Sequence, residues 1–185
     1  MHTKNPTRAL IVVASAAIWL AGSLLYRWAA PHTGFVPGID IIYPPAGLRT
    51  LLLIVGGGWA ALGVTIANLA MVPEEMGLHS LTSRILFSAY AGLVPYVAMI
   101  GSFRLLGIGR GLTDLSPRHL PVLCFGIALG SSVLHVAAFC VIGTVPWSSF
   151  VTAAAAMTLG DFTGCLVVIL VALGVIKTFR MIGAR

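Results

Sequence analysis

The sequence predicts an all-α fold, a polytopic integral membrane bundle of about six helical segments in which residues 1–185 form one domain. Of the 185 residues, 58% are hydrophobic and only 9% are charged, whereas about 25% of a soluble domain is charged. The apolar residues form runs near the roughly 20 residues that a helix needs to cross a bilayer. Basic residues stand at the ends of these runs and form no stripe interleaved with aromatic residues. We therefore expect the lipid bilayer as a partner, and no nucleic acid.

The first membrane segment is predicted at residues 9–29. A short basic N-terminus precedes an apolar run, a pattern that cleaved signal peptides also show. This run is longer than their usual hydrophobic region, and it ends in Tyr26-Arg27-Trp28, which is typical of an anchor at the membrane interface. We therefore expect an uncleaved helix, followed by a loop over residues 30–40 that is rich in proline and glycine.

The stretch 41–72 is mostly apolar and too long for one upright crossing of a hydrocarbon core roughly 30 Å thick. A glycine triplet at 56–58 divides it into two parts, 41–55 and 59–72. Each part is about 22 Å long at 1.5 Å per residue, which is a little short for a full crossing. The sequence therefore predicts a short helical hairpin, and whether it spans the membrane or is re-entrant stays open.

Three longer segments follow, at 85–103, 120–142 and 150–176. Pro95 lies in the middle of the first of them, where it predicts a kink. The other two each carry a pair of glycines four residues apart, a spacing that lets membrane helices pack closely. These pairs are Gly126 with Gly130, and Gly160 with Gly164.

The distribution of basic residues predicts the orientation. The N-terminus, the connection 104–119 and the C-terminus are all basic, so all three are expected on the cytoplasmic side of a bacterial inner membrane. Both ends of the stretch 41–72 then face outward, which requires an even number of crossings and favours the hairpin. The turn of this hairpin carries no basic residue of its own.

Several polar residues lie within the predicted helices, where ionisable groups are costly and usually face the interior of a bundle. By helix rise they all fall in the outer half of the membrane, which predicts a ligand- or partner-binding pocket open to the outside. A buried charge is tolerated when it is paired, so we expect Arg49 to face Asp161. The alternative is that these groups only hold the helices together. The predicted pocket residues are Tyr43, Pro44, Pro45, Arg49, Asn68, His135 and Asp161.

The residues of the chain form no arrangement that is typical of catalysis. The three cysteines all lie inside apolar runs, without metal-binding or redox spacing. Ser131 and Ser132 precede His135 by about one helical turn, but small polar residues in membrane helices more often serve packing. The glycine triplet is not followed by the residues of a phosphate-binding loop. We expect no enzymatic activity, no metal and no cofactor.

Two patches of the sequence resemble the bacterial membrane-associated sensor domain of the first type, the MASE family. The first is similar to the family's aromatic-Pro-x-Ala-Gly motif and the glycine and asparagine positions that follow it. The second is similar to the family's Gly-Asp-x-x-Gly motif in a late helix. Order and spacing agree from the first helix to about residue 176. The patches are Tyr43-Pro44-Pro45-Ala46-Gly47 with Gly56, Gly63 and Asn68, and Leu159-Gly160-Asp161-Phe162-Thr163-Gly164.

The resemblance implies an integral membrane input module, because members of this family usually precede a histidine kinase or a diguanylate cyclase. This chain departs from the pattern in having Tyr43 where tryptophan is common, and Gly57-Gly58-Trp59 where a basic residue is common. Family members also often continue with more helices. We expect a stand-alone chain without an output domain, whose signal passes to another polypeptide.

Three functions stay open at this point. The first is a sensor-like module that binds a small-molecule ligand, or another membrane or signalling protein, through the outward-facing pocket and has no catalytic output of its own. The second is an accessory subunit that packs against a larger membrane complex through its glycine pairs. The third is the six-helix substrate-binding component of a transporter, since transporters use broken helices with charge at depth. We favour the first.

Overall fold

The computed structural model describes residues 5–29, 34–36, 39–40, 42–71, 80–109 and 119–183. Five long helices make up most of this part of the chain. Each is long and apolar enough to cross a membrane. The described part of the chain is thus almost entirely helical, as predicted, and its helices fit a membrane protein. The helices are α1 (Asn5–Ala29), α2 (Pro44–Met71), α3 (Leu81–Leu105), α4 (His119–Ile142) and α5 (Phe150–Gly183).

The predicted count of six membrane segments is not confirmed. The stretch predicted as two segments is α2, in which two helical parts join across a kink. Its helical geometry is interrupted at Gly57, which has a φ of 56° and a ψ of −138°. Glycine adopts a positive φ at little cost because it has no Cβ. The break falls inside the predicted glycine turn, but helix continues on both sides with no loop between the two parts.

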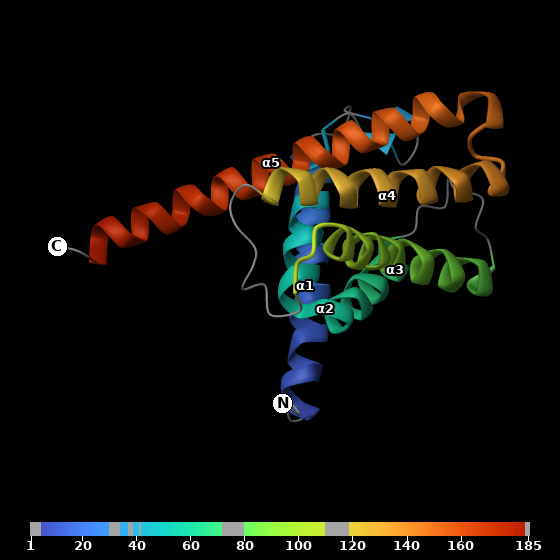
Figure 1. Ribbon diagram of the computed structural model, residues 1–185. Helices are drawn as coiled ribbons and strands as arrows, with labels where there is room; N and C mark the ends of the chain where they lie inside the picture. Colours follow the sequence, from blue (N-terminus) through green and yellow to red (C-terminus); the bar gives the residue numbers. More distant parts are fainter. Residues whose placement is uncertain are drawn as a thin grey trace.

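Helix α2 reverses its direction at Gly57. In a straight helix, Arg49 and Asn68 would lie about 28 Å apart at 1.5 Å per residue. Both instead meet Trp19 of α1: the Arg49 guanidinium lies 5.6 Å from the centre of the indole ring, and the indole N–H donates to the Asn68 side-chain oxygen at 2.8 Å. The helix is therefore a hairpin with a first arm (44–56) and a second arm (58–71), and Figure 1 shows the sharp turn between them.

The two ends of this hairpin lie at opposite ends of α1. At the turn, the guanidinium of Arg8 lies 5.3 Å from the centre of the Trp59 ring. At the other end, the rings of Tyr26 and Tyr43 meet edge to face at 5.3 Å. The first arm therefore runs along most of α1, and α1 supplies the basic residue that the sequence of the turn lacks.

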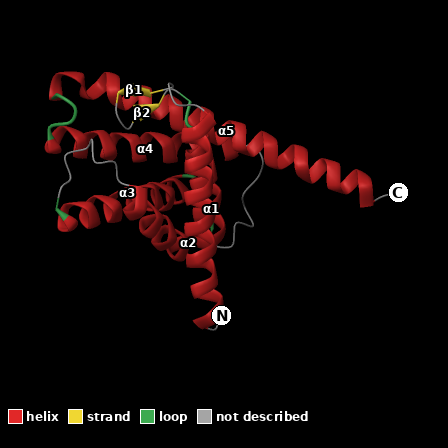
Figure 2. Cartoon of the chain, turned by 180° about the vertical axis from the view of Figure 1, so that it is seen from behind, coloured by secondary structure: helices red, strands yellow, loops and turns green. Residues whose placement is uncertain are grey.

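Helices α3, α4 and α5 follow one another as antiparallel neighbours (Figure 2). Gly126 of α4 faces Ser102 near the end of α3, whereas Phe139 of α4 stacks on Phe87 near the beginning of α3 at 6.1 Å. In Figures 1 and 2, α1 and the first arm of α2 cross α4 and α5 steeply. The C-terminal part of α5 extends beyond the other helices, so one long helix leaves the bundle.

Several predicted boundaries move. Helix α3 begins at Leu81 and continues unbroken through Pro95, which is buried. Helix α5 runs to Gly183, past the predicted end at 176. Most of the basic connection 104–119, and the connection after α2, lie outside the described residues.

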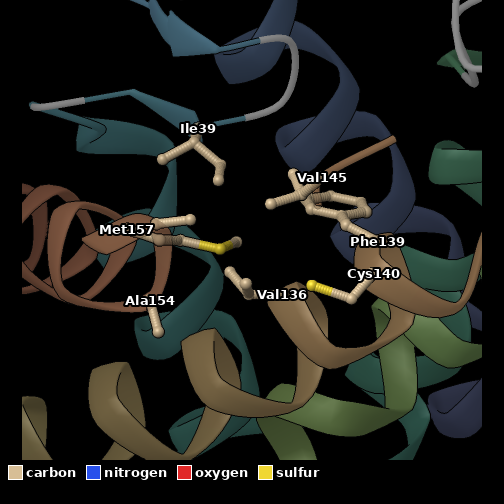
Figure 3. Packing of buried hydrophobic residues seen from close by; sticks show 8 residues of the cluster. Ile39, Val136, Phe139, Cys140, Val145, Ala154 and Met157 are labelled. Atoms are coloured by element: carbon tan, nitrogen blue, oxygen red, sulfur yellow. The ribbon is translucent and has the colours of Figure 1, made fainter. Parts of the chain in front are cut away.

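A buried apolar cluster closes one end of the bundle (Figure 3). Part of the predicted loop forms two short antiparallel strands, β1 (Gly34–Val36) and β2 (Ile39–Asp40). Ile39 of β2 is fully buried and packs against the end of α4 and the beginning of α5. The connection from α1 to α2 is therefore fixed to the distant α4–α5 turn. The other members of the cluster are Val136, Phe139, Cys140, Val145, Ala153, Ala154 and Met157.

Asp40, next to Ile39, gives a prediction about pH. Partial burial raises the pKa of this carboxyl, and a hydrogen bond from Tyr26 and the charge of Arg27 oppose the rise. A carboxyl with a higher pKa in the folded state holds more protons when folded, so stability falls as the pH rises through that window. We expect Asp40→Asn to remove this loss. As the pH rises from about 4, the melting temperature should then fall less in the variant than in the wild type. A difference in melting temperature between the two proteins that stays the same at every pH would contradict the prediction.

Candidate functional site

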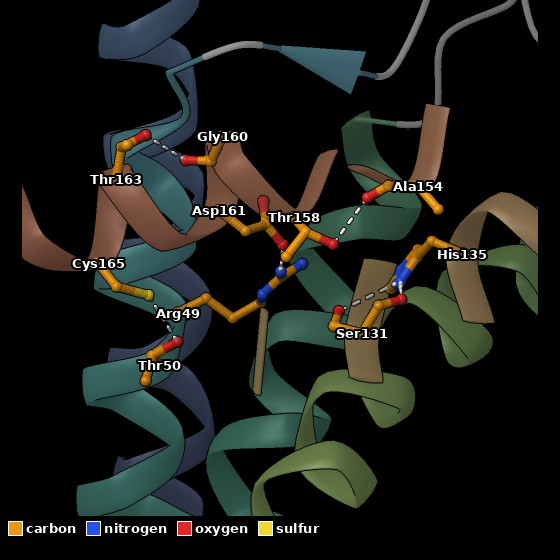
Figure 4. A network of polar contacts seen from close by, with 10 residues as sticks. All are labelled: Arg49, Thr50, Ser131, His135, Ala154, Thr158, Gly160, Asp161, Thr163 and Cys165. Atoms are coloured by element: carbon orange, nitrogen blue, oxygen red, sulfur yellow. Dashed lines mark hydrogen bonds and ion pairs between the residues drawn. The ribbon is translucent and has the colours of Figure 1, made fainter. Parts of the chain in front are cut away.

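An ion pair buried between α2 and α5 is the centre of the candidate site (Figure 4). A terminal nitrogen of Arg49 donates to a carboxylate oxygen of Asp161 at 3.1 Å, and only 8% and 4% of the two side chains are exposed. Arg49 lies on the first arm of α2, and Asp161 lies in the N-terminal half of α5. The expected pairing of these two residues is therefore present. Each side chain compensates the charge of the other in the interior.

The environment of Arg49 extends the site to α1. Its guanidinium lies 5.6 Å from the centre of the Trp19 ring, a distance at which the face of an indole attracts a cation. The indole N–H of Trp19 in turn donates to Asn68 on the second arm of α2. The Nε of Arg49 is buried and has no hydrogen-bond partner among the described residues. Asp161, Arg49, Trp19 and Asn68 thus connect α5, both arms of α2, and α1.

Three residues of the predicted outward-facing pocket are buried. Arg49 is 6% exposed, His135 is 4% exposed and Asp161 is 3% exposed, so all three lie in the interior of the bundle. Asn68 is bonded to Trp19 rather than turned toward a ligand. The depth of each residue was predicted from the helix rise, but depth does not tell which way a side chain faces. In the structure these side chains face neighbouring helices.

The beginning of α2 packs directly on the backbone of α5. The backbone N–H of Tyr43 donates to the carbonyl of Gly160 at 3.1 Å. One turn further along α5, a Cβ at Gly164 would collide with the carbonyl of Tyr43. Gly47 likewise leaves no room between its own backbone and that of Gly164. Pro44 and Pro45, predicted as pocket residues, belong to the first turn of α2; the nitrogen of Pro44 lies at this contact, and Pro45 is buried.

Both glycine pairs are used inside the chain. Gly160 and Gly164 receive the beginning of α2. Gly126 and Gly130 of α4 face side chains of α3, those of Ser102 and Ala98. The close approach predicted from their spacing is present, and its partners are the protein's own helices.

His135 lies apart from this contact, in an environment of its own. Its Nδ1 lies 2.8 Å from the Ser131 carbonyl and 3.3 Å from the Ser131 hydroxyl, both on its own helix. Its ring meets the Tyr90 ring of α3 edge to face at 5.6 Å, and the Tyr90 hydroxyl donates to the carbonyl of Leu134 at 2.5 Å. The histidine therefore has partners that join α4 to α3.

Two features of the site were missed from the sequence. Trp19 is the residue that brings the two arms of α2 together, and its one signal was a tryptophan in the middle of an apolar run rather than at the interface. The second feature is an apolar cavity of about 150 Å³ between the first arm of α2, α4 and α5. Two of the cysteines line it, Cys124 and Cys165; the sequence indicated only small buried side chains at these positions.

Comparison with known proteins finds no family model, no curated protein and no solved structure that matches this chain. The resemblance to the membrane-associated sensor family therefore stays a prediction. The structure adds one observation to it. The two patches that carry the resemblance lie in contact, through Tyr43 with Gly160 and Gly47 with Gly164.

The bond between Trp19 and Asn68 gives a second prediction. We expect Asn68→Leu to lower the free energy of unfolding by about 1 kcal/mol, because the buried indole N–H of Trp19 loses its acceptor. Unfolding in mixed detergent micelles measures this. Trp19→Phe removes the donor of the same hydrogen bond and completes a double-mutant cycle. The loss in the double variant should be smaller than the sum of the two single losses. Fully additive losses would contradict the pairing.

Proposed function

We propose that this chain is a sensor-like module of a bacterial inner membrane, with no catalytic activity of its own. In this proposal the Arg49–Asp161 ion pair holds the α2 hairpin against α5. A small ligand or a membrane partner would change that contact, and α5 would pass the change to another membrane or signalling protein. The observation that carries the proposal is the buried ion pair at 3.1 Å.

The ion pair supports a switching role because stability alone does not require it. Apolar residues of similar size often replace a buried ion pair without loss of stability, and ionisable groups inside a membrane usually mark functional positions. This pair joins a hairpin whose helical geometry breaks at Gly57 to a helix that extends beyond the bundle.

The contacts between helix ends support the proposed orientation. The hairpin turn lies beside Arg8, near the N-terminus. The end of α3 packs at the same level, since Phe103 and Leu106 contact the cluster that contains Ala60 and Ala61 beside the turn. The basic N-terminal end of α1 and the basic end of α3 therefore lie at the same level as the hairpin turn. Our proposal assigns this level to the cytoplasmic side and expects both termini there.

The two other functions are less well supported. An accessory subunit was expected to use its glycine pairs for docking, but both pairs already pack against α2 and α3. A transporter would place a helix break beside its bound charge near the midplane. Here the break at Gly57 lies near Arg8, at the opposite end of α1 from Tyr43.

The proposal is tested by isolating the tagged chain from native membranes in mild detergent and quantifying bound proteins by mass spectrometry. We expect one signalling or membrane protein in fixed ratio with the wild type. The ratio should change with Asp161→Asn and return with the exchanged pair Arg49→Asp and Asp161→Arg. Asp40→Asn, which lies outside the ion pair, is the control. Recovery of the chain alone, or the same ratio in every variant, would refute the proposal.

A further inference from the structure

A pair of thiols lies beside the ion pair, and the proposed function makes no use of it. Cys124 of α4 is 1% exposed and Cys165 of α5 is 2% exposed. The two cysteines line the same small cavity between α4 and α5. The sulfur of Cys165 also lies 3.5 Å from the hydroxyl of Thr50, on the first arm of α2. Three different elements therefore meet at two sulfur atoms.

Space for a ligand adjoins these thiols. Both cysteines and Thr50 line the cavity of about 150 Å³, and the rest of its wall is apolar. The cavity is partly open, and an apolar space of about this size accepts small, polarisable guests. Such a place does not suit a hard, hydrated ion. It suits a guest that sheds its water easily and bonds to sulfur.

We propose that Cys124 and Cys165 form a binding site for a soft metal ion that two sulfur ligands satisfy, such as Hg(II) or Cu(I). Thiolate sulfur selects soft ions of this kind. Zinc fits less well, because it takes four ligands in structural sites, and the described residues contain no group of three or more histidine, cysteine, aspartate or glutamate side chains.

Binding replaces two S–H bonds with two sulfur–metal bonds, and both protons leave to solvent. The oxidation state of the metal does not change. With Hg(II) the product, two thiolates and a doubly charged ion, is neutral. With Cu(I) the product carries one negative charge. Because charge is costly in an apolar interior, we expect the site to hold Hg(II) more tightly than Cu(I).

This site goes beyond the proposed function and does not depend on it. Cys165 lies one helical turn after Asp161 on α5, and Thr50 follows Arg49 on α2, so a bound metal would lie beside the ion pair. Metal binding is nevertheless measured on the chain alone. A chain that binds metal but captures no partner would refute the proposed function and leave the metal site intact.

The test uses the full chain, reduced and purified in detergent micelles without oxygen. Hg(II) is titrated against an excess of a competing single thiol, and the ultraviolet band of the mercury–thiolate bond is followed. We expect one ion per chain, and at least a 100-fold weaker apparent affinity in Cys124→Ser or Cys165→Ser. Cys140→Ser is the matched control, since Cys140 is also buried but belongs to the cluster around Ile39 and Phe139. It should bind as the wild type does.

A second measurement needs no variant. In the wild type, one equivalent of Hg(II) should protect Cys124 and Cys165, but not Cys140, from alkylation after unfolding, as read by mass spectrometry of the peptides. Cu(I), supplied against a competing chelator, should give the same pattern with weaker binding. Equal protection of all three cysteines, or a Cys140→Ser variant that loses as much affinity as the other two, would overturn the proposal.

Discussion

Asp161→Asn should destabilise the protein by about 3–5 kcal/mol, the largest effect that we expect from any single substitution. Asparagine cannot compensate the Arg49 charge, and removing one member of a buried ion pair leaves the other uncompensated. Arg49 is 6% exposed, so water cannot take over this role. The free energy of unfolding in mixed detergent micelles, followed by helical circular dichroism, measures the loss.

The reverse substitution, Arg49→Leu, should cost less than Asp161→Asn. A carboxyl left alone in an apolar interior can take up a proton and become neutral, whereas an arginine in a protein keeps its charge. The double variant Arg49→Leu with Asp161→Leu should recover most of the stability, because two apolar side chains replace a buried pair at little cost. Equal losses in both single variants, or a loss below about 1 kcal/mol for Asp161→Asn, would show that the pair is not the buried contact described here.

The ion pair could be predicted from the sequence because a charge in an apolar interior needs an opposite charge beside it, and the chain offers few such partners. Arg49 and Asp161 were both placed deep in the outer half of the membrane, so each was the natural partner of the other. The break at Gly57 was predictable for a similar reason, since the stretch 41–72 is too long for one upright helix and glycine alone tolerates the required φ. Both inferences rest on constraints that apply to any membrane protein.

The partner of Asn68 and the facing of His135 could not be predicted in this way. In a soluble helix the apolar stripe shows which face is buried, but a membrane helix is apolar on all sides and shows no such stripe. The level of a residue then follows from helix rise, whereas its direction depends on how the helices are rotated against each other. Residues placed at one depth were therefore expected to share an open pocket, although Asn68 turns to Trp19 and His135 turns to Tyr90.

The glycine pair of α5 shows the same limit at the level of the backbone. Its spacing indicated close packing of two helices. What lies against it is the beginning of α2, namely helical Gly47 together with the irregular backbone at Tyr43 just before the first turn. Gly160 and Gly164 flank Asp161 on α5. This contact therefore fixes the position of α2 along α5 at which Arg49 reaches Asp161. The two sequence patches that resemble a sensor family thus form one structural unit, in which the glycines bring the backbones together and the charges join the side chains.

Gly164→Ala tests this unit and should cost about 2–3 kcal/mol of unfolding free energy. The added Cβ would collide with the backbone carbonyl of Tyr43, and a backbone carbonyl cannot swing aside as a flexible side chain can. The beginning of α2 must then move away from α5, and the bond from Tyr43 to Gly160 is lost with it. The expected loss is measured by unfolding in mixed micelles, as for the ion pair.

Gly101→Ala is the matched control, because Gly101 lies inside α3 and a Cβ there meets no atom within 4 Å. Alanine is the better helix former, so this variant should be unchanged or more stable by up to about 1 kcal/mol. Combining Gly164→Ala with Asp161→Asn should cost less than the sum of the two single losses, because the first change already separates the elements that the ion pair joins. Full additivity would mean that the glycine contact and the ion pair act independently, and equal effects of Gly164→Ala and Gly101→Ala would mean that α2 does not rest on the backbone of α5.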